Sequence, residues 1–299
     1  MLIINAFDRV SAPAIIETDK FSGFLDFLDQ GVADRYSIGY TGMQFNFRPT
    51  SKWLDDDAPG FGASWADYET RIIPGNTFDY PYLHGQSLKT CGYSFISASD
   101  ESIIDGEVDI TQYRLVDLIL GEEKSTYMPK PNGIIDFKTF PAGLQFQLTR
   151  FCQANGNLFL SGAYLGSDLF QAAVIDSQDI KFAQQILHYK LRTDHAVKTG
   201  RVYAVDPFFK PALQPFEFNT GYDPGIYTVE APEAIEPFDS PAKTIFRYAE
   251  NNMSAAVAYR GSYKVIALGF PFETIIKQEQ RNQLMDQILK FLTTDNGTK

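Results

Sequence analysis

The stretch G-N-L-F-L-S-G-A-Y-L-G-S-D-L, residues 156–169, predicts a buried strand that runs into a glycine-rich turn and then into a helix. Many α/β enzymes present a nucleophile at the apex of such a strand–turn–helix unit. The apex residue here is Tyr164, and a phenol with an unperturbed pKa near ~10 is mostly protonated at neutral pH. The stretch therefore fits a working active site, a site that has lost its chemistry, or a tight turn alone.

Strand and helix patterns continue on both sides of this stretch. Apolar runs and helical spacing of apolar residues alternate through the first two-thirds of the chain, and β-meander patterns follow. This order predicts an α/β fold, a three-layer sandwich with a mainly parallel sheet, in one domain over residues 1–299. The predicted strands are 2–7, 92–98, 113–120, 158–162, 201–205, 243–249, 253–259 and 263–270, and the predicted helices are 20–30, 141–154, 177–191 and 273–293.

Two segments lack this periodicity. Residues 31–85 are rich in Gly, Pro, Asp and aromatic residues, and residues 206–241 combine many prolines with short apolar pieces. Loops of this length are unusual within a compact domain and are often functional. We therefore expect two loop-rich insertions in the α/β fold, at about residues 31–85 and 206–241.

Charge and hydropathy narrow the class of protein. The 299-residue chain has a formal net charge of −11, a field that repels phosphate backbones and so argues against nucleic acid as a partner. No apolar run approaches the ~18–20 residues of a membrane span. The first residues show no signal peptide, which fits either a cytoplasmic protein or a domain of a longer exported chain.

The two cysteines and three histidines are scattered, so we expect neither a metal site nor a cofactor.

Polar residues follow several predicted strands, at the edge where ligands bind in open parallel sheets. Asp8 and Arg9 follow the first strand, and either form a salt bridge or grip a substrate carboxylate. Glu122 and Glu273 follow two later strands, and are candidates for an acid/base pair if their carboxyls lie ~5–10 Å apart.

Further candidates lie in the turn and in the first insertion. Tyr164, Ser167 and Asp168 are candidates for ligand contact, although Asp168 is also placed to cap the following helix. His84 falls in the insertion, where a loop position favours binding. Trp53 and Trp65 predict either an aromatic platform for a sugar or neighbouring domain, or a small core of the insertion itself.

Two motifs resemble the class I glutamine amidotransferases. Gly162-Ala163-Tyr164-Leu165-Gly166 resembles the G-x-C-x-G elbow of that family, and Phe270-Pro271-Phe272-Glu273 resembles its F-H-P-E segment. The order of the two motifs is also similar, and the resemblance implies a flavodoxin-like arrangement of strands and helices.

At two positions the chain departs from that family, and these are the positions of the family's catalytic nucleophile and base. Tyr164 stands where the family has its nucleophilic cysteine, and Pro271 stands where it has its histidine; only Glu273 keeps its identity. Amide attack needs a thiolate and a neighbouring base. We therefore expect no glutaminase activity.

A second resemblance covers nearly the whole chain. The phrases "INAFDRVSAP", "DDDAPGFGAS", "PGNTFDYPYLHG", "VDLILGEEK", "LFLSGAYLGSDL" and "ALGFPFETI" resemble a domain of large exported bacterial proteins labelled xanthan lyase or golvesin C-terminal-like, some with an upstream N-acetylmuramoyl-L-alanine amidase domain. The resemblance implies a periplasmic, cell-surface or secreted location, with flanking domains in the same polypeptide.

Three functional hypotheses follow. The first is a non-catalytic amidotransferase-like domain that binds glycan or a cell-wall fragment, or docks a neighbouring domain. The second is a hydrolase of glycan or cell-wall amide, with a relocated site built from Asp8, Arg9, His84, Glu122 and Glu273. The third is a spacer that only organises flanking domains.

Overall fold

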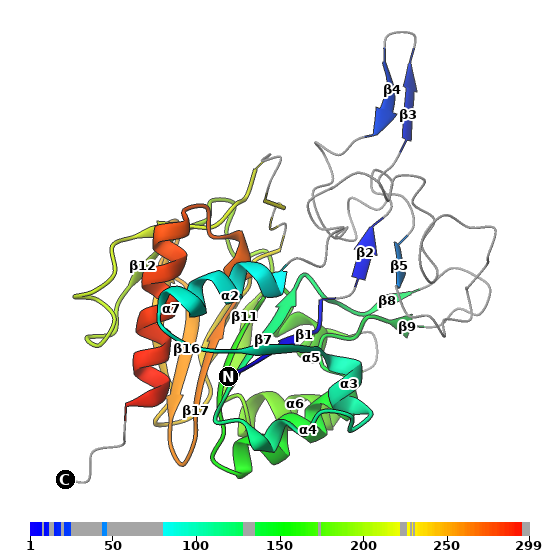
Figure 1. Ribbon diagram of the computed structural model, residues 1–299. Coiled ribbons are helices and arrows are strands. Elements are labelled where there is room, and N and C mark those ends of the chain that lie inside the picture. Colours follow the sequence, from blue (N-terminus) through cyan, green and yellow to red (C-terminus); the bar gives the residue numbers. More distant parts are fainter. Residues whose placement is uncertain are drawn as a thin grey trace.

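A nine-stranded mixed sheet forms the centre of the computed structural model (Figure 1). The structure describes residues 1–7, 9–11, 15–18, 21–24, 44–46, 80–127, 135–172, 175–221, 226–227, 229 and 231–294. The strand order is β13-β12-β15-β16-β17-β10-β7-β1-β6. These strands are β1 (Leu2–Asn5), β6 (Ile96–Ser99), β7 (Leu115–Gly121), β10 (Asn157–Gly162), β12 (Arg201–Ala204), β13 (Phe216–Glu217), β15 (Lys243–Tyr248), β16 (Ser254–Arg260) and β17 (Lys264–Leu268).

One part of the sheet is parallel and the other antiparallel. Strands β17, β10, β7, β1 and β6 pair in parallel. Strands β16, β15, β12 and β13 then extend the sheet by antiparallel pairing. All seven residues of β7 are buried, as expected for a parallel strand covered on both faces. The prediction of an α/β sandwich with a mainly parallel central sheet is confirmed in these terms.

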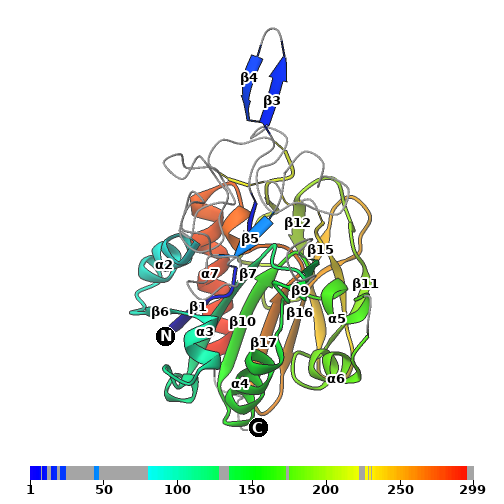
Figure 2. The same ribbon diagram turned by 90° about the vertical axis from the view of Figure 1, so that its right-hand side faces the viewer.

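Helices cover both faces of the sheet (Figures 1 and 2). One face carries α2 (Tyr80–Thr90), α7 (Gln278–Thr293) and the short helix η2 (Phe272–Thr274). The other face carries α3 (Asp100–Ile104), α4 (Ala142–Gln153), α5 (Ser167–Phe170) and α6 (Ser177–Gln185), with η1 (Ile110–Gln112) beside them. We call the side of the sheet that α2, α7 and η2 cover, with the side chains packed between them and the sheet, the α2/α7 face.

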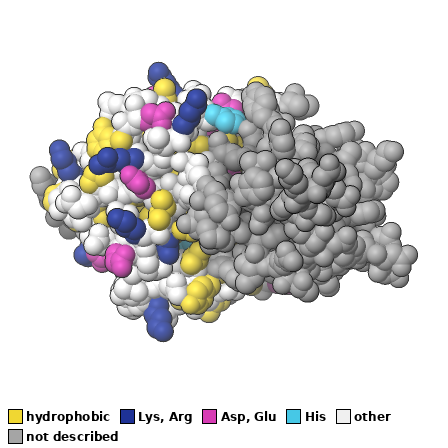
Figure 3. Space-filling model, turned by 90° about the horizontal axis from the view of Figure 1, so that it is seen from above, with side chains coloured by type: hydrophobic (Ala, Val, Ile, Leu, Met, Phe, Trp, Pro, Cys, Tyr) yellow, Lys and Arg dark blue, Asp and Glu magenta, His cyan; other side chains and the backbone are white. Residues whose placement is uncertain are grey.

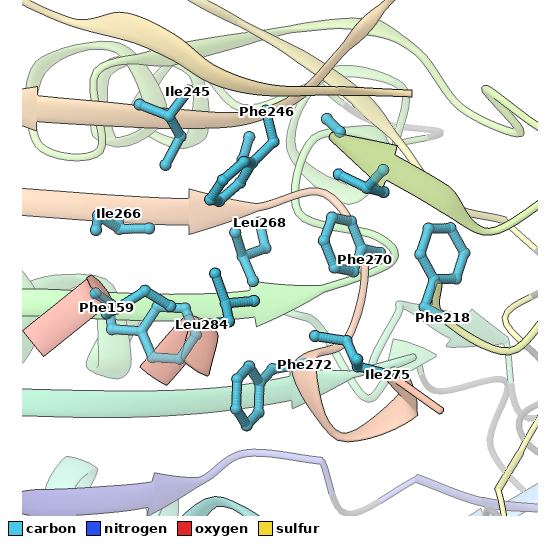
Figure 4. Close-up of a cluster of buried hydrophobic side chains, with 14 of the residues drawn as sticks. Phe159, Phe218, Ile245, Phe246, Ile266, Leu268, Phe270, Phe272, Ile275 and Leu284 are labelled. Carbon is cyan, nitrogen blue, oxygen red and sulfur yellow. The ribbon is translucent and has the colours of Figure 1, made fainter. Parts of the chain in front are cut away.

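Alternation along the strands divides the core between the two faces. In β10, Phe159 points to the α2/α7 face, whereas Leu158 and Leu160 point to the opposite face, which α4 and α6 cover, as the two-residue period of a strand requires. Figure 4 shows the apolar side chains that gather on the α2/α7 face, among them Phe159 and Leu284 of α7. Truncating a buried leucine such as Leu284 to alanine costs about 2–5 kcal/mol.

Four small two-stranded sheets complete the described elements. They are β2 (Arg9–Ser11) with β5 (Gln44–Asn46), β3 (Ile15–Thr18) with β4 (Phe21–Phe24), β8 (Thr126–Tyr127) with β9 (Ile135–Asp136), and β11 (Tyr189–Thr193) with β14 (Ala234–Pro237).

Three predicted helices differ from the structure. Residues 21–24 of the predicted helix 20–30 form β4, where Gly23, a poor helix former, pairs with Ile16. The predicted helix 177–191 ends at Gln185, and its last residues join β11. Helix α7 begins at Gln278 rather than at Glu273, because residues 272–274 form the separate turn η2.

The two predicted insertions contain more regular structure than expected. Residues 80–85 of the first belong to α2, so His84 lies in a helix and not in a loop. Residues 206–241 include β13 and β14, and the aromatic residues Phe209, Phe216 and Phe218 of this segment are buried in the core. Because short apolar pieces between prolines carry no strand period, the sequence does not reveal that β13 pairs with β12 and β14 with β11.

Candidate functional site

The turn after β10 has the shape that the sequence predicts, but its apex points inward. Residues 163–166 connect β10 to the single turn of α5, and Gly162 has no room for a side chain because a Cβ would lie 2.9 Å from Leu120 Cβ. The side chain of Tyr164 is only 4% exposed, and the Lys124 ammonium lies 4.6 Å from its ring centroid. Tyr164 therefore packs into the core rather than presenting its phenol to solvent.

The buried carboxyl group of Glu233 accepts hydrogen bonds from the backbone amides at the end of this turn. The N–H groups of Gly166 and Ser167 donate to the two oxygens of Glu233, at 2.5 and 2.7 Å. Glu233 is fully buried, and burial raises the pKa of its carboxyl to about 8, although the hydrogen bonds from Ser167 and Gly166 act in the opposite direction. The predicted ligand position at the start of this helix is thus filled by the chain itself.

Asp168 ties two neighbouring segments to the turn. Its carboxylate accepts the backbone N–H of Ser125 at 3.0 Å and of Thr139 at 2.8 Å. These are amides of other segments and not of its own helix, so Asp168 does not act as the helix cap that the sequence suggests. It fixes the segments after β7 and before α4 against the turn.

A buried cluster of titratable side chains lies on the α2/α7 face and centres on His84. Helical spacing places His84 on the buried stripe of α2, together with Tyr80, Ser87 and Leu88. Its Nδ1 lies 2.9 Å from Asp117 Oδ2, and its Nε2 lies 3.3 Å from Glu273 Oε2. All three side chains are buried.

Strand alternation and a short turn bring the two carboxylates to the histidine. Asp117 lies within β7 between Val116 and Leu118, which point to the opposite face, so its carboxylate points toward α2. Glu273 lies in η2, where the chain leaves β17. The triad therefore joins a helix, a central strand and the turn after a second strand.

A tyrosine and aromatic rings complete the surroundings of this triad. The hydroxyl of Tyr227 donates to Glu273 Oε1 at 2.7 Å. The rings of Phe272 and Phe159 lie 4.7 and 6.3 Å from the His84 ring, centroid to centroid. This apolar lining removes the polar groups from water and strengthens the electrostatic attraction between them.

The carboxylates determine the charge of His84. Burial alone lowers the pKa of its imidazole, but the charges and hydrogen bonds of Asp117 and Glu273 outweigh burial and raise that pKa from 6.5 to about 9. For Tyr227, burial and the nearby charge of Glu273 both raise the pKa of the phenol, to well above 10. At neutral pH His84 is therefore an imidazolium that donates from both nitrogens, and it has no lone pair with which to act as a general base.

The structure brings together part of the predicted relocated site. His84 and Glu273 are in contact, and Glu122 is buried close enough to raise the pKa of Tyr227. Tyr164, Ser167 and Asp168 lie at the turn after β10. Asp8, Trp53, Trp65 and the side chain of Arg9 lie outside the described residues.

The sequence patterns did not predict three residues that surround the candidate sites. Asp117 carried a signal, because a lone carboxylate within the apolar run 113–120 is costly to bury without a partner. Tyr227 and Glu233 carried none, because both come from the proline-rich segment 206–241, whose sequence shows no period. Their positions depend on the path of that segment across the end of the sheet.

Within the described ranges, no group of three or more His, Cys, Asp or Glu side chains is arranged to hold a metal ion. Among the same residues, no helix combines the length and the apolar character needed to cross a membrane. Comparison with models of known protein families found no match to the chain, and no curated protein is significantly similar to it.

Proposed function

We propose that this chain is a non-catalytic, amidotransferase-like domain with a flavodoxin-like core, which binds glycan or docks a neighbouring domain of an exported polysaccharide- or cell-wall-associated protein. One observation carries the proposal. The histidine at the candidate site has both ring nitrogens engaged by carboxylates, and it is completely buried. A base in this state does not activate a nucleophile.

The turn after β10 supports the same conclusion. Tyr164 and Pro271 replace the nucleophile and base of the resembling enzymes, and the amides of Gly166 and Ser167 already bind Glu233. A scaffold that keeps the turn and fills it with its own carboxyl group fits binding or docking at another surface. Exposed flanking surfaces would then serve glycan or the neighbouring domains of the polypeptide.

The catalytic and binding parts of this proposal are tested separately. The protein is incubated with glutamine, and released ammonia is measured; we expect none above the buffer. Ammonia release that disappears in Tyr164→Phe contradicts the proposal. Binding is tested by a glycan array and a peptidoglycan pull-down, and Trp53→Ala and Trp65→Ala then test the predicted aromatic platform.

A hydrolase with a relocated acid/base site is the second candidate. The observation that favours it is the convergence of His84, Glu273 and Asp117, with Glu122 nearby. It predicts turnover of glycan or cell-wall amide that is abolished in Glu273→Gln while the fold is retained. Absence of turnover across polysaccharide and peptidoglycan substrates argues for the non-catalytic domain.

A further inference from the structure

A groove of about 380 Å³ opens at the antiparallel end of the sheet, between β15, β16, α7 and residues 206–208. Lys243 and Ile245 alternate on β15, and Ala258 and Arg260 alternate on β16, so all four point to the α2/α7 face. The small Ala258 and the aliphatic Ile245 form an apolar floor, and the two cations stand at its border. A groove of this volume accommodates a small ligand.

Aromatic rings form one wall of the groove. Phe208 remains 37% exposed, and its ring lies edge-on to that of Phe291, with centroids 5.7 Å apart. The Arg260 guanidinium lies 4.4 Å from the Phe291 centroid and 5.8 Å from that of Phe208. Stacking on two rings orients the guanidinium while leaving its N–H groups able to bind a planar anion.

The groove has a positive charge in a chain of net charge −11. In the part of the chain that the structure describes, neither Lys243 nor Arg260 forms an ion pair with a carboxylate. Asp206, the acidic residue in the lining, uses Oδ1 to accept the N–H of Phe208 at 2.9 Å. The three charges sum to one positive charge, which complements one carboxylate group of a ligand better than a multiply charged phosphate group.

We infer that this groove binds a carboxylate-bearing sugar, a sugar acid of the uronic class. The carboxylate of the ligand pairs with Arg260 and Lys243, and the apolar face of its ring packs on Phe208. A ring hydroxyl donates to Asp206, which a plain aromatic acid without hydroxyls does not provide. This inference rests on the glycan-binding arm of the proposed function and specifies the place and class of the ligand.

The test measures binding of trigalacturonic acid and of neutral maltotriose to the full chain by titration calorimetry. We expect trigalacturonic acid to bind and maltotriose to bind at least about tenfold more weakly, since a charge-assisted pair contributes about 1.5–3 kcal/mol. Arg260→Gln and Lys243→Gln are each expected to weaken binding of the acid about tenfold. Salt at about 500 mM weakens it further by screening.

Arg192→Gln is the matched control. Its side chain is 55% exposed and lies 3.4 Å from Glu236, on β11 and outside the groove lining, so affinity should not change. Because Arg260 also stacks on Phe291, the melting temperature of each variant is measured, and Lys243→Gln gives a test that does not disturb that stacking.

Three outcomes overturn the inference. If the acid binds both groove variants as tightly as it binds the wild-type chain, its site lies elsewhere. If maltotriose binds as tightly as the acid and neither variant matters, the glycan arm of the proposed function survives but this groove is not its charged subsite. If neither sugar binds the wild-type chain, the groove is not a sugar site; the non-catalytic role is judged separately by the ammonia assay.

Discussion

Two regions of the molecule gather charged and aromatic side chains, and they differ in how those charges are satisfied. On the α2/α7 face, His84, Asp117 and Glu273 are buried and paired with one another. At the antiparallel end, Lys243 and Arg260 border a groove and form no ion pair with a described carboxylate. In the first region the polar side chains bind one another and so stabilise the fold. In the second region the two cations remain available to bind a ligand.

This difference separates structural from functional charge. Three titratable residues in the core resemble a catalytic triad when only their types are considered, yet they are buried and hydrogen-bonded through His84. Removing one partner of a buried ion pair leaves the other charge buried with neither a partner nor water to solvate it, which lowers the stability of the fold. Removing an exposed cation that has no ion-pair partner leaves no other charge uncompensated. The free energy of unfolding of such variants therefore distinguishes the two regions.

The largest expected effect is at Asp117. Asp117→Ala removes the carboxylate that lies 2.9 Å from His84 Nδ1 and should lower the free energy of unfolding by about 3–5 kcal/mol. Urea unfolding followed by circular dichroism measures the loss. Asp286→Ala is the control, because it breaks the partly exposed Lys290–Asp286 pair at a cost below about 1 kcal/mol. Equal losses in the two variants would show that the triad does not support the fold.

The pKa of His84 predicts a loss of stability at alkaline pH. The pKa is raised from 6.5 to about 9 in the folded protein, so the folded state binds this proton more tightly than the unfolded state. The stabilisation is complete below pH 6.5 and is lost as the pH rises through 9, amounting to about 3 kcal/mol. Unfolding measured from pH 6 to 10 in wild type and in His84→Gln should show a difference that shrinks over this range; a constant difference contradicts the assignment.

A smaller loss in the free energy of unfolding is expected when Glu233, which binds the turn after β10, is replaced. Glu233→Gln keeps one acceptor oxygen and places an amide nitrogen where the second oxygen meets a backbone N–H of Gly166 or Ser167. One amide then lacks an acceptor, which costs about 1–3 kcal/mol. The measurement is urea unfolding, and hydrogen exchange at Gly166 and Ser167 reports the same loss locally. Unchanged exchange at both amides would mean that Glu233 does not hold the turn.

The strands and helices that carry a strong period could be predicted from the sequence. The buried runs around Val116 and Leu160 and the helix that contains Leu148 follow from apolar patterns alone. The helix that begins at Tyr80 could not be predicted, because its aromatic and glycine residues are of the same types as those in the sequence before it. Pairing of β11 with β14 depends on residues 41 or more positions apart and leaves no local pattern.

Two residues of the buried triad, Glu273 and His84, were predicted from the sequence, and the third was not. Glu273 was found because it follows a predicted strand, and His84 was found as a residue although its helix was not. Asp117 lies inside a strand rather than at its end, and Glu233 comes from a segment without periodicity. Electrostatic pairing of this kind is a property of the assembled fold, since its partners come from separate segments of the chain.

The smallest expected effect on stability is at the groove. Lys243→Gln removes an exposed cation that forms no described ion pair, so the free energy of unfolding should change by less than about 0.5 kcal/mol. The same substitution is expected to weaken binding of the sugar acid, and the contrast with Asp117→Ala is the measurement that matters. A loss of stability comparable to that of Asp117→Ala would show that the charges of the groove, like those of the triad, belong to the fold. A small loss with weakened binding places the ligand at the end of the sheet where charge remains unpaired.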